Sequence, residues 1–323
     1  MNSPSSPTQS AALPFAVAFL GIAIFSAMDA VMKHLSIVIG AYNAMLWRTI
    51  ISLVVLAPIF VLRGGRWPER AVFRLHVLRG ATAGLSLLLF FWALARVPLA
   101  EGIALSFIAP LIALALAAFF LKEKIARSAL FASVLAFGGV LVIVAGQPGA
   151  AAGGSNWQGQ AAILLAAVLY AVSIVAGRRQ AQAAGPLEIA LFFNIVAGAL
   201  LLVAAPRFAI LPDWTHFPPL ILATMAANIS IMLIAWAYAR AETQYLLPVE
   251  YTAFLWAAMF GWLVFGEAVT AATLSGAVLI VAACLLAARS NRGIAHADVH
   301  LDVAGTGSDI ASDPLIAPES ADS

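Results

Sequence analysis

A few ionisable side chains interrupt long apolar stretches of the sequence: Asp29, Lys33, Arg48, Glu101 and Glu250. A charge in an apolar environment costs about 3 kcal/mol or more unless it is paired or reaches water. Asp29 and Lys33 are four residues apart, so they share one face of a helix. Together with Arg48 and Glu101 they could bind a charged solute. They could equally form an ion-pair cluster that only packs helices, in which Asp29 or Glu101 pairs with Arg48.

Glu250 stands apart from the other four charges and lies between Pro248 and Tyr251. A proline inside an apolar helix frees a backbone carbonyl, and this is tolerated where the carbonyl lines a cavity. A carboxylate beside such a break could bind a cationic group or carry a proton. The alternative is an ion pair with a nearby arginine such as Arg79 or Arg240.

Aromatic and amide side chains in the middle of the apolar stretches could complete a binding site. A planar organic solute would stack on the rings, and the amides would hydrogen-bond its heteroatoms. Taken singly, each tryptophan could equally anchor the chain at a membrane interface or fill space between helices. The members of this set are Trp92, Tyr170, Asn194, Asn228, Trp236, Tyr251 and Trp256.

Signs of catalysis are weak. An enzyme needs a paired nucleophile and base or a metal cluster. All five histidines are expected near helix ends, in loops or in the C-terminal tail, and the one cysteine, Cys284, lies in an apolar run. Glu123 and Glu267 are expected to bond backbone amides at helix ends rather than touch a solute. No catalytic residue, metal site or cofactor is therefore predicted, and a membrane-embedded enzyme acting on a lipid or peptide is the second hypothesis.

The elements that position these residues follow from composition. Hydrophobic residues make up 63% of the 323 residues, charged residues make up 10%, and the mean hydropathy is +1.00. A soluble domain carries roughly 25% charged residues, so most of this surface must face lipid. Ten continuously apolar stretches predict an all-α integral membrane protein rather than a barrel. They are residues 13–35, 43–62, 80–95, 100–121, 128–145, 159–177, 186–205, 218–239, 245–265 and 270–288.

Basic residues predict the orientation of these spans. With the N-terminus inside, 13 of the 17 Lys and Arg residues fall in inside connections or the C-terminal tail. Both termini are therefore expected in the cytoplasm, most simply of a bacterial inner membrane. Residues 1–12 and the acidic tail 289–323 are expected to be disordered, since they have little to bury. Residues 147–158, rich in Gly and Ala, are expected to link two halves, 13–146 and 159–288.

The two halves are related by an internal repeat. A shift of 144 residues places Trp92 on Trp236, Arg96 on Arg240 and Glu123 on Glu267. Five spans is an odd number, so the second copy enters the membrane from the opposite side. Inverted repeats are a recurring way to build a carrier, because two similar bundles can rock about a shared central site. Duplication could also only have enlarged a helical scaffold.

Several motifs resemble the EamA domains of the drug/metabolite transporter superfamily. In the first half they lie at residues 79–80, 90–94, 97–101, 105–107, 110–111 and 120–124, and in the second at residues 247–251, 262, 265–267 and 276. The segments 26–30 and 248–251 are most similar to the branch that includes S-adenosylmethionine and riboflavin carriers. Two positions depart from the pattern: Ser173 stands where the first repeat has Asp29, and Lys122 replaces a small residue. These departures limit what the resemblance says about the solute.

The resemblance implies a ten-helix permease with inverted five-helix repeats and cytoplasmic termini. We expect a secondary transporter that moves a small organic metabolite by alternating access. The expected partners are the solute, whose movement could be coupled to protons through Asp29 or Glu250, the lipid bilayer, and a second copy of the chain in a homodimer. No nucleic acid is expected.

Overall fold

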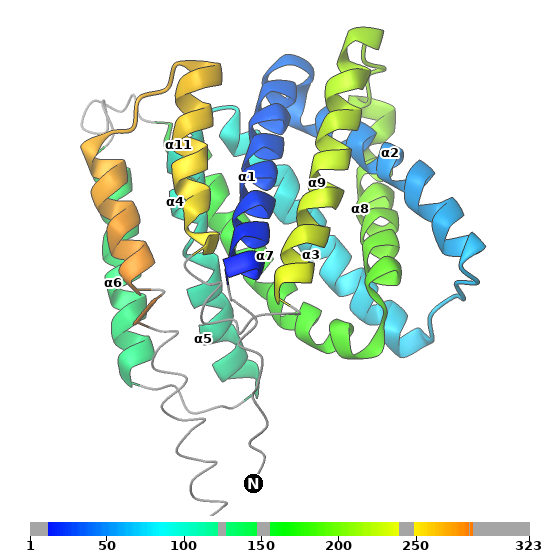
Figure 1. The fold of residues 1–323 in the computed structure, drawn as a ribbon, viewed down its shortest axis with the longest axis horizontal. Helices are drawn as coiled ribbons and strands as arrows, with labels where there is room; N and C mark the ends of the chain where they lie inside the picture. The colour runs from blue at the N-terminus through cyan, green and yellow to red at the C-terminus, as the bar shows by residue number, and fades with distance from the viewer. Residues whose placement is uncertain (1–11, 122–126, 147–155, 239–248, 284, 287–323) are drawn as a thin grey trace, which may run out of the picture.

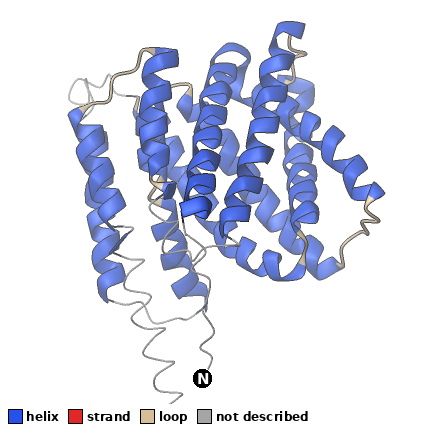
Figure 2. Ribbon diagram, viewed as in Figure 1, coloured by secondary structure: helices blue, strands red, loops and turns tan. Residues whose placement is uncertain are grey.

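The computed structural model describes residues 12–121, 127–146, 156–238, 249–283 and 285–286, and in these ranges the chain forms helices and loops without a strand (Figures 1 and 2). In chain order the helices are α1 (Ala12–Leu35), η1 (Ser36–Gly40), α2 (Ala41–Leu62), α3 (Arg70–Leu94), α4 (Leu99–Ser106), α5 (Ala109–Leu121), α6 (Arg127–Ala145), α7 (Trp157–Ala183), α8 (Pro186–Phe208), η3 (Trp214–His216), α9 (Phe217–Tyr238) and α11 (Thr252–Phe265). A last apolar helix spans Ala271–Ala283. Below, the upper end of the bundle is the end at which η1 lies, and the lower end is where α1 begins (Figure 1).

The outward surface of the bundle is apolar. Leu62, Val203 and Met232 are 86%, 83% and 71% exposed. Large apolar side chains in such numbers face water only rarely, because exposing them is unfavourable. Five described segments are long and apolar enough to span a bilayer, and four shorter apolar helices accompany them. The chain is a multi-pass membrane protein, as its composition predicts.

Helices of the two halves pack against one another in matching pairs. The pairs are α3 with α7 and α1 with α9, α2 with α8, and α4 with α11. Small residues make several of these approaches close. A Cβ on Gly80 would lie 2.7 Å from Val196, and one on Gly84 would lie 2.9 Å from Ala197. Close packing of this kind substitutes for the hydrophobic effect, which does not drive helices together in lipid.

Two serines show the repeat in atomic detail. Ser86 Oγ, on α3, donates to the carbonyl of Ala166 on α7 at 2.7 Å. Ser230 Oγ, on α9, donates to the carbonyl of Gly21 on α1 at 2.9 Å. Ser86 and Ser230 are separated by the 144-residue shift that relates the halves. Each half thus packs its third helix against the first helix of the other half, and the two contacts are equivalent under the repeat.

The helices break at aligned positions in both repeats. The expected span 100–121 is two helices, because α4 ends at Ser106 and α5 begins at Ala109. Pro110 explains the break, since proline has no N–H to donate and is tolerated in the first turn of a helix. In the second repeat α11 begins at Thr252, immediately after Tyr251. The shift of 144 residues places Phe107 on Tyr251.

These two aligned residues touch each other. The rings of Phe107 and Tyr251 lie 5.4 Å apart at 89°, edge to face. When two residues related by an approximate two-fold axis are in contact, the axis passes between them. The pseudo-two-fold axis of the bundle therefore passes through this contact, where both repeats interrupt a helix.

Some predictions fall outside the described residues. These are the predicted disorder of 1–12, of which the structure describes only the last residue, and of the tail 289–323, most of the linker 147–158, and the roles of Glu123, Pro248 and Arg240.

Candidate functional site: a clamp at the upper end and polar groups in the bundle

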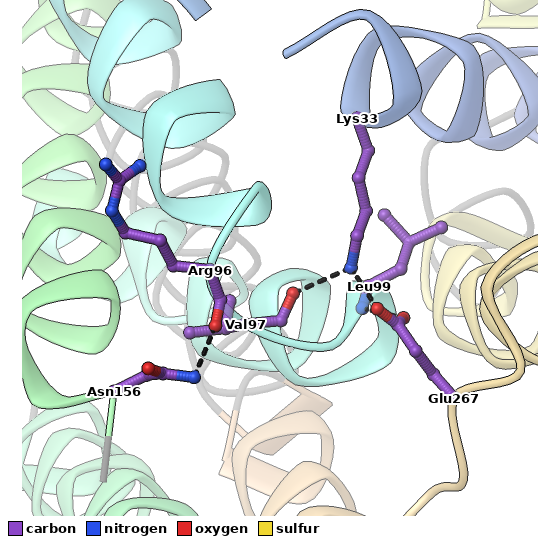
Figure 3. A network of polar contacts seen from close by, with 6 residues as sticks. All are labelled: Lys33, Arg96, Val97, Leu99, Asn156 and Glu267. Carbon is purple, nitrogen blue, oxygen red and sulfur yellow. Dashed lines mark hydrogen bonds and ion pairs between the residues drawn. The ribbon is translucent and has the colours of Figure 1, made fainter. Parts of the chain in front are cut away.

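Lys33 joins three segments at the upper end. Its ammonium group forms an ion pair with Glu267 and donates to the Val97 carbonyl at 2.7 Å. The other carboxylate oxygen of Glu267 accepts the backbone N–H of Leu99 at 2.8 Å. Figure 3 shows the lysine reaching from α1 to both partners. We call Lys33, Val97, Leu99 and Glu267 the upper clamp. It ties the end of α1 to the start of α4 and to the loop after α11.

Glu101 lies beneath this clamp and is buried. Its carboxylate accepts a hydrogen bond from Gln160 Nε2 at 2.8 Å and interacts electrostatically with Lys33 and Glu267. The space enclosed here is only about 10 Å³, lined by Glu101, Glu267 and Ala258 among others. That is room for one water molecule and not for a metabolite. A separate and more open space of about 410 Å³ lies among α1, α9 and α11, where it is lined by Ala30, His34, Pro219 and Val264 among others.

Asp29 and Arg48 form a second group, on α1 and α2. Both are buried, with 4% and 8% of their surface exposed, and they lie within electrostatic range of each other. Among the described residues no hydrogen bond or ion pair joins either side chain to a partner. Arg48 Nε is a buried donor without an acceptor, and so is the hydroxyl of Ser26, one turn before Asp29. The sequence left open whether Asp29 or Glu101 pairs with Arg48; Asp29 is the acid within electrostatic range, but no ion pair to Arg48 is formed by either.

Tyr170 and Glu250 come together in the middle of the bundle. Tyr170 is the central residue of α7, and Glu250 directly precedes Tyr251 at the second helix break. The two side chains interact electrostatically, and Arg79 of α3 also acts on Tyr170. Tyr170 is 48% exposed although α7 packs against α3, α4 and α5. Glu250 is exposed as well. Two polar side chains are therefore accessible close to the second helix break.

A hydrogen-bonded relay supports Arg79 from below. Arg79 Nη1 donates to Gln180 Oε1 at 2.7 Å, and Gln180 Nε2 lies 2.5 Å from His76 Nδ1. His76 Nε2 lies 3.0 Å from a carboxylate oxygen of Glu188. Because arginine can only donate, the glutamine oxygen faces Arg79 and its nitrogen must donate to His76. His76 then carries its hydrogen on Nε2, so all three bonds run in one direction.

The remaining predicted residues are spread over the bundle. The Arg96 guanidinium lies over the Trp92 ring, with its central carbon 3.6 Å from the ring centre. Asn194 is buried and donates to Ala190 of its own helix at 2.9 Å. Asn228 is half-buried on α9, and Trp236 packs with a small apolar cluster around Ala18 and Ile22. The predicted site residues thus occupy several places rather than one.

The sequence did not reveal all of these contacts. Glu267 was expected to bond a backbone amide, which it does, but it also pairs with Lys33. Gln160 was not singled out. His76 was expected near a helix end or in a loop, and it lies in the second turn of α3, where it is fully buried. The signal that could have placed it is the helical spacing of apolar residues that continues from Val72 to Gly80 through His76.

No group of three or more potential metal ligands occurs among the residues that the structure describes.

Comparison with known proteins gives a consistent result. The profile of the EamA-like transporter family matches the chain twice, at residues 13–145 and 157–289. The pseudopaline exporter of Pseudomonas aeruginosa is 28% identical over 282 residues, which cover 86% of this chain and 96% of the exporter.

Two further relatives carry other solutes in their names. A riboflavin transporter of Brucella anthropi is 27% identical over 76% of this chain and 87% of its own length. An S-adenosylmethionine uptake transporter of Rickettsia bellii is 22% identical over 82% of this chain and 90% of its own length. A crystal structure with 20% sequence identity superposes with a TM-score of 0.57 over 88% of this chain and 99% of that chain, which supports the fold.

Proposed function

The chain belongs to the EamA-like transporter family, and from that premise we propose that its solute crosses the membrane at the pseudo-two-fold axis, between the two aligned helix breaks. Its relatives are named as transporters and exporters of small organic molecules. The chain is accordingly a secondary transporter of a small organic metabolite and not an enzyme acting on a lipid or peptide. What remains to be assigned is the pathway, the direction and the coupling.

The contact between Phe107 and Tyr251 is the observation that supports this pathway. Transporters built from inverted repeats bind solute near the bilayer midplane, where corresponding helices of the two repeats are interrupted. Here the interruptions coincide under the repeat shift, and their residues touch. Glu250 directly precedes Tyr251, and it interacts electrostatically with Tyr170; both side chains are exposed. Aromatic rings and one carboxylate at such a place suit a solute with a flat or cationic part.

The upper clamp supports a particular state of the transport cycle. With the clamp formed, the space directly beneath it is too small for a metabolite. Alternating access needs this contact to break when the solute leaves or enters from above. The distribution of basic residues supports the upper end as the outer face, with both termini in the cytoplasm of a bacterial inner membrane. The clamp would then be the outer gate.

The chemical class of the solute is proposed from the relatives. Riboflavin, S-adenosylmethionine and pseudopaline, named for three of them, are small organic metabolites with polar groups. We take riboflavin and S-adenosylmethionine as first probes, since both contain flat ring systems that could stack on Tyr170 or Tyr251. The homodimer expected from the sequence stays a prediction.

The test is transport by purified protein in liposomes. Vesicles preloaded with unlabelled probe should take up labelled probe faster than protein-free vesicles. Tyr251→Ala should reduce the rate at least tenfold, whereas Glu69→Gln, an exposed charge in the connection before α3, should leave it unchanged. If neither probe nor a wider metabolite panel is transported, or if Tyr251→Ala transports like the parent, the proposed pathway is wrong.

Proton coupling is tested in the same vesicles. Glu250→Gln and Asp29→Asn are compared with the parent protein between pH 5.5 and 8.5, with and without an imposed proton gradient. A carboxylate that carries the coupled proton should make uptake independent of pH when it is replaced by its amide. Unchanged pH profiles in both variants would remove these two residues from the coupling.

A further inference from the structure

The buried pair Asp29 and Arg48 differs from the other charges of the bundle in having no partner. Lys33, one turn above Asp29 on the same helix, has both an anion and a carbonyl. Glu101 has an amide donor. Asp29 and Arg48 face each other within electrostatic range, yet no nitrogen of one lies within 4.0 Å of an oxygen of the other.

This arrangement is costly as it stands. An arginine removed from water is stable only when its N–H groups are bonded, and an aspartate only when its oxygens accept bonds. Here Arg48 Nε is fully enclosed without an acceptor, and the Ser26 hydroxyl on the face of α1 that carries Asp29 is unpaired too. Met28, which precedes Asp29, and Met45, one turn before Arg48, belong to the buried apolar core. The neighbourhood thus contains a donor, an acceptor and a hydroxyl that lack counterparts.

A direct ion pair between Asp29 and Arg48 would have removed this cost, but α1 and α2 do not bring the two side chains close enough to form one. The counterpart that satisfies both groups at once must bring a positive group for Asp29 and a negative group for Arg48. A simple anion would leave Asp29 unpaired and repelled, and a simple cation would do the same to Arg48. A molecule with both charges a few atoms apart meets both needs and adds no net charge to the membrane interior.

We propose that Asp29 and Arg48, with Ser26, form a subsite for a zwitterion of the α-amino-acid type, whose ammonium group binds Asp29 and whose carboxylate binds Arg48. This inference rests on the proposed transport function and names the chemical class of the solute or of one part of it. A guanidinium accepts a carboxylate in a two-point contact, which gives Arg48 a geometric preference as well as a charge preference. The Ser26 hydroxyl supplies a further hydrogen bond at the same helix face.

Binding to the detergent-purified full chain tests the subsite without requiring transport. The probes are L-phenylalanine, L-methionine and L-lysine, each compared with its N-acetyl derivative and its methyl ester, by the concentration dependence of thermal stabilisation. The N-acetyl form has lost the ammonium charge and the ester has lost the carboxylate. At least one parent amino acid should bind the protein, and both of its derivatives should bind roughly tenfold more weakly or worse.

Single substitutions separate the two contacts. Asp29→Asn should lose the preference over the N-acetyl derivative and keep the preference over the ester, and Arg48→Gln should do the reverse. Asp29→Glu and Arg48→Lys keep the charges and should retain part of the discrimination. Arg66→Gln, an exposed charge in the connection between α2 and α3, is the matched control. Size-exclusion chromatography identifies any variant that has failed to fold, and the conservative pair then carries the comparison.

Two results would overturn the assignment. One is that none of the three amino acids stabilises the parent protein, or that the derivatives bind as well as the zwitterions. The other is that the substitutions weaken all probes equally, which is the behaviour of an ion pair that only holds α1 to α2. Either result leaves the transport proposal standing if vesicles still exchange a metabolite. Loss of all transport with intact zwitterion binding would instead refute the pathway and keep the subsite.

Discussion

The upper clamp makes the sharpest prediction, because its two charged members differ in burial. The Lys33 side chain is 3% exposed and that of Glu267 is 21% exposed. Removing one member of a buried ion pair costs about 3–5 kcal/mol, because the other charge is left without a partner. Glu267→Gln strands a nearly enclosed ammonium group, which still has the Val97 carbonyl, so we expect a cost of about 3 kcal/mol. Lys33→Met leaves a partly hydrated carboxylate that keeps the Leu99 N–H, and should cost about 1–2 kcal/mol.

This cost should favour opening of the upper end. If the clamp exists only in the closed state, a loss of about 3 kcal/mol shifts the ratio of closed to open molecules by roughly a hundredfold. Glu267→Gln should therefore open the upper end more than Lys33→Met. Arg96→Gln, which removes an exposed charge at the same end without touching the clamp, should have no effect.

The assay is the reaction of a single cysteine with a membrane-impermeant thiol reagent. Ala258→Cys places the thiol beside the small void beneath the clamp, in a background where the one native cysteine, Cys284, is replaced by serine. Labelling from the side of the membrane that the upper end faces should be slow in the parent, faster in Lys33→Met and fastest in Glu267→Gln. Equal labelling rates in all three proteins, at equal folded fraction, would refute the clamp as a gate. The reverse order of the two variants would refute the argument from burial.

Three further predictions concern packing and hydrogen bonding. Gly139→Ala should destabilise the protein by about 1–3 kcal/mol in chemical denaturation, because the added methyl group would lie 2.8 Å from the Gly276 carbonyl oxygen. The adjacent Gly138→Ala is the control: its methyl group would meet nothing within 4 Å, so it should be neutral or slightly stabilising. Ser86→Ala and Ser230→Ala should each cost about 1 kcal/mol, because the two serines make equivalent hydrogen bonds in the two repeats. A loss of stability confined to one of the two variants would contradict that equivalence. Gln180→Leu should cost about 2–5 kcal/mol in the same denaturation measurement, because it leaves both Arg79 and His76 Nδ1 without their partner. Thr82→Val removes a hydroxyl that bonds only carbonyls of its own helix, and it should cost less than about 1 kcal/mol.

The relation between the repeats illustrates how far sequence alone could go. The 144-residue shift is visible in the chain, and the odd number of spans requires inversion. The packing of each third helix against the other half, by contrast, was visible only once Ser86 and Ser230 were seen to donate to the first helix of the opposite half. Likewise Pro110 marks a weak point in a span, but the contact of Phe107 with its own repeat equivalent emerges only from packing.

The sequence by itself determined the class of protein. Hydropathy is a local property, and the need to satisfy backbone groups inside lipid leaves continuous apolar runs little choice but helices. The membrane character, the all-helical architecture, the repeat and the family therefore followed from composition, run length and motif. The same reasoning identified the charges whose burial needed explaining, because an ionisable residue within an apolar run stands out wherever its partner lies.

Only the tertiary structure decided which charges meet. Lys33 and Glu267 are separated by 234 residues and belong to opposite repeats, so no spacing rule links them. Tyr170 and Glu250 were both suspected, yet their proximity depends on how α7 sits beside the second helix break. Asp29 and Arg48 could have formed a simple ion pair, and it is the distance set by α1 and α2 that left them apart. Pairing of buried charges depends on the inverted packing of helices from both halves, which a one-dimensional pattern does not contain.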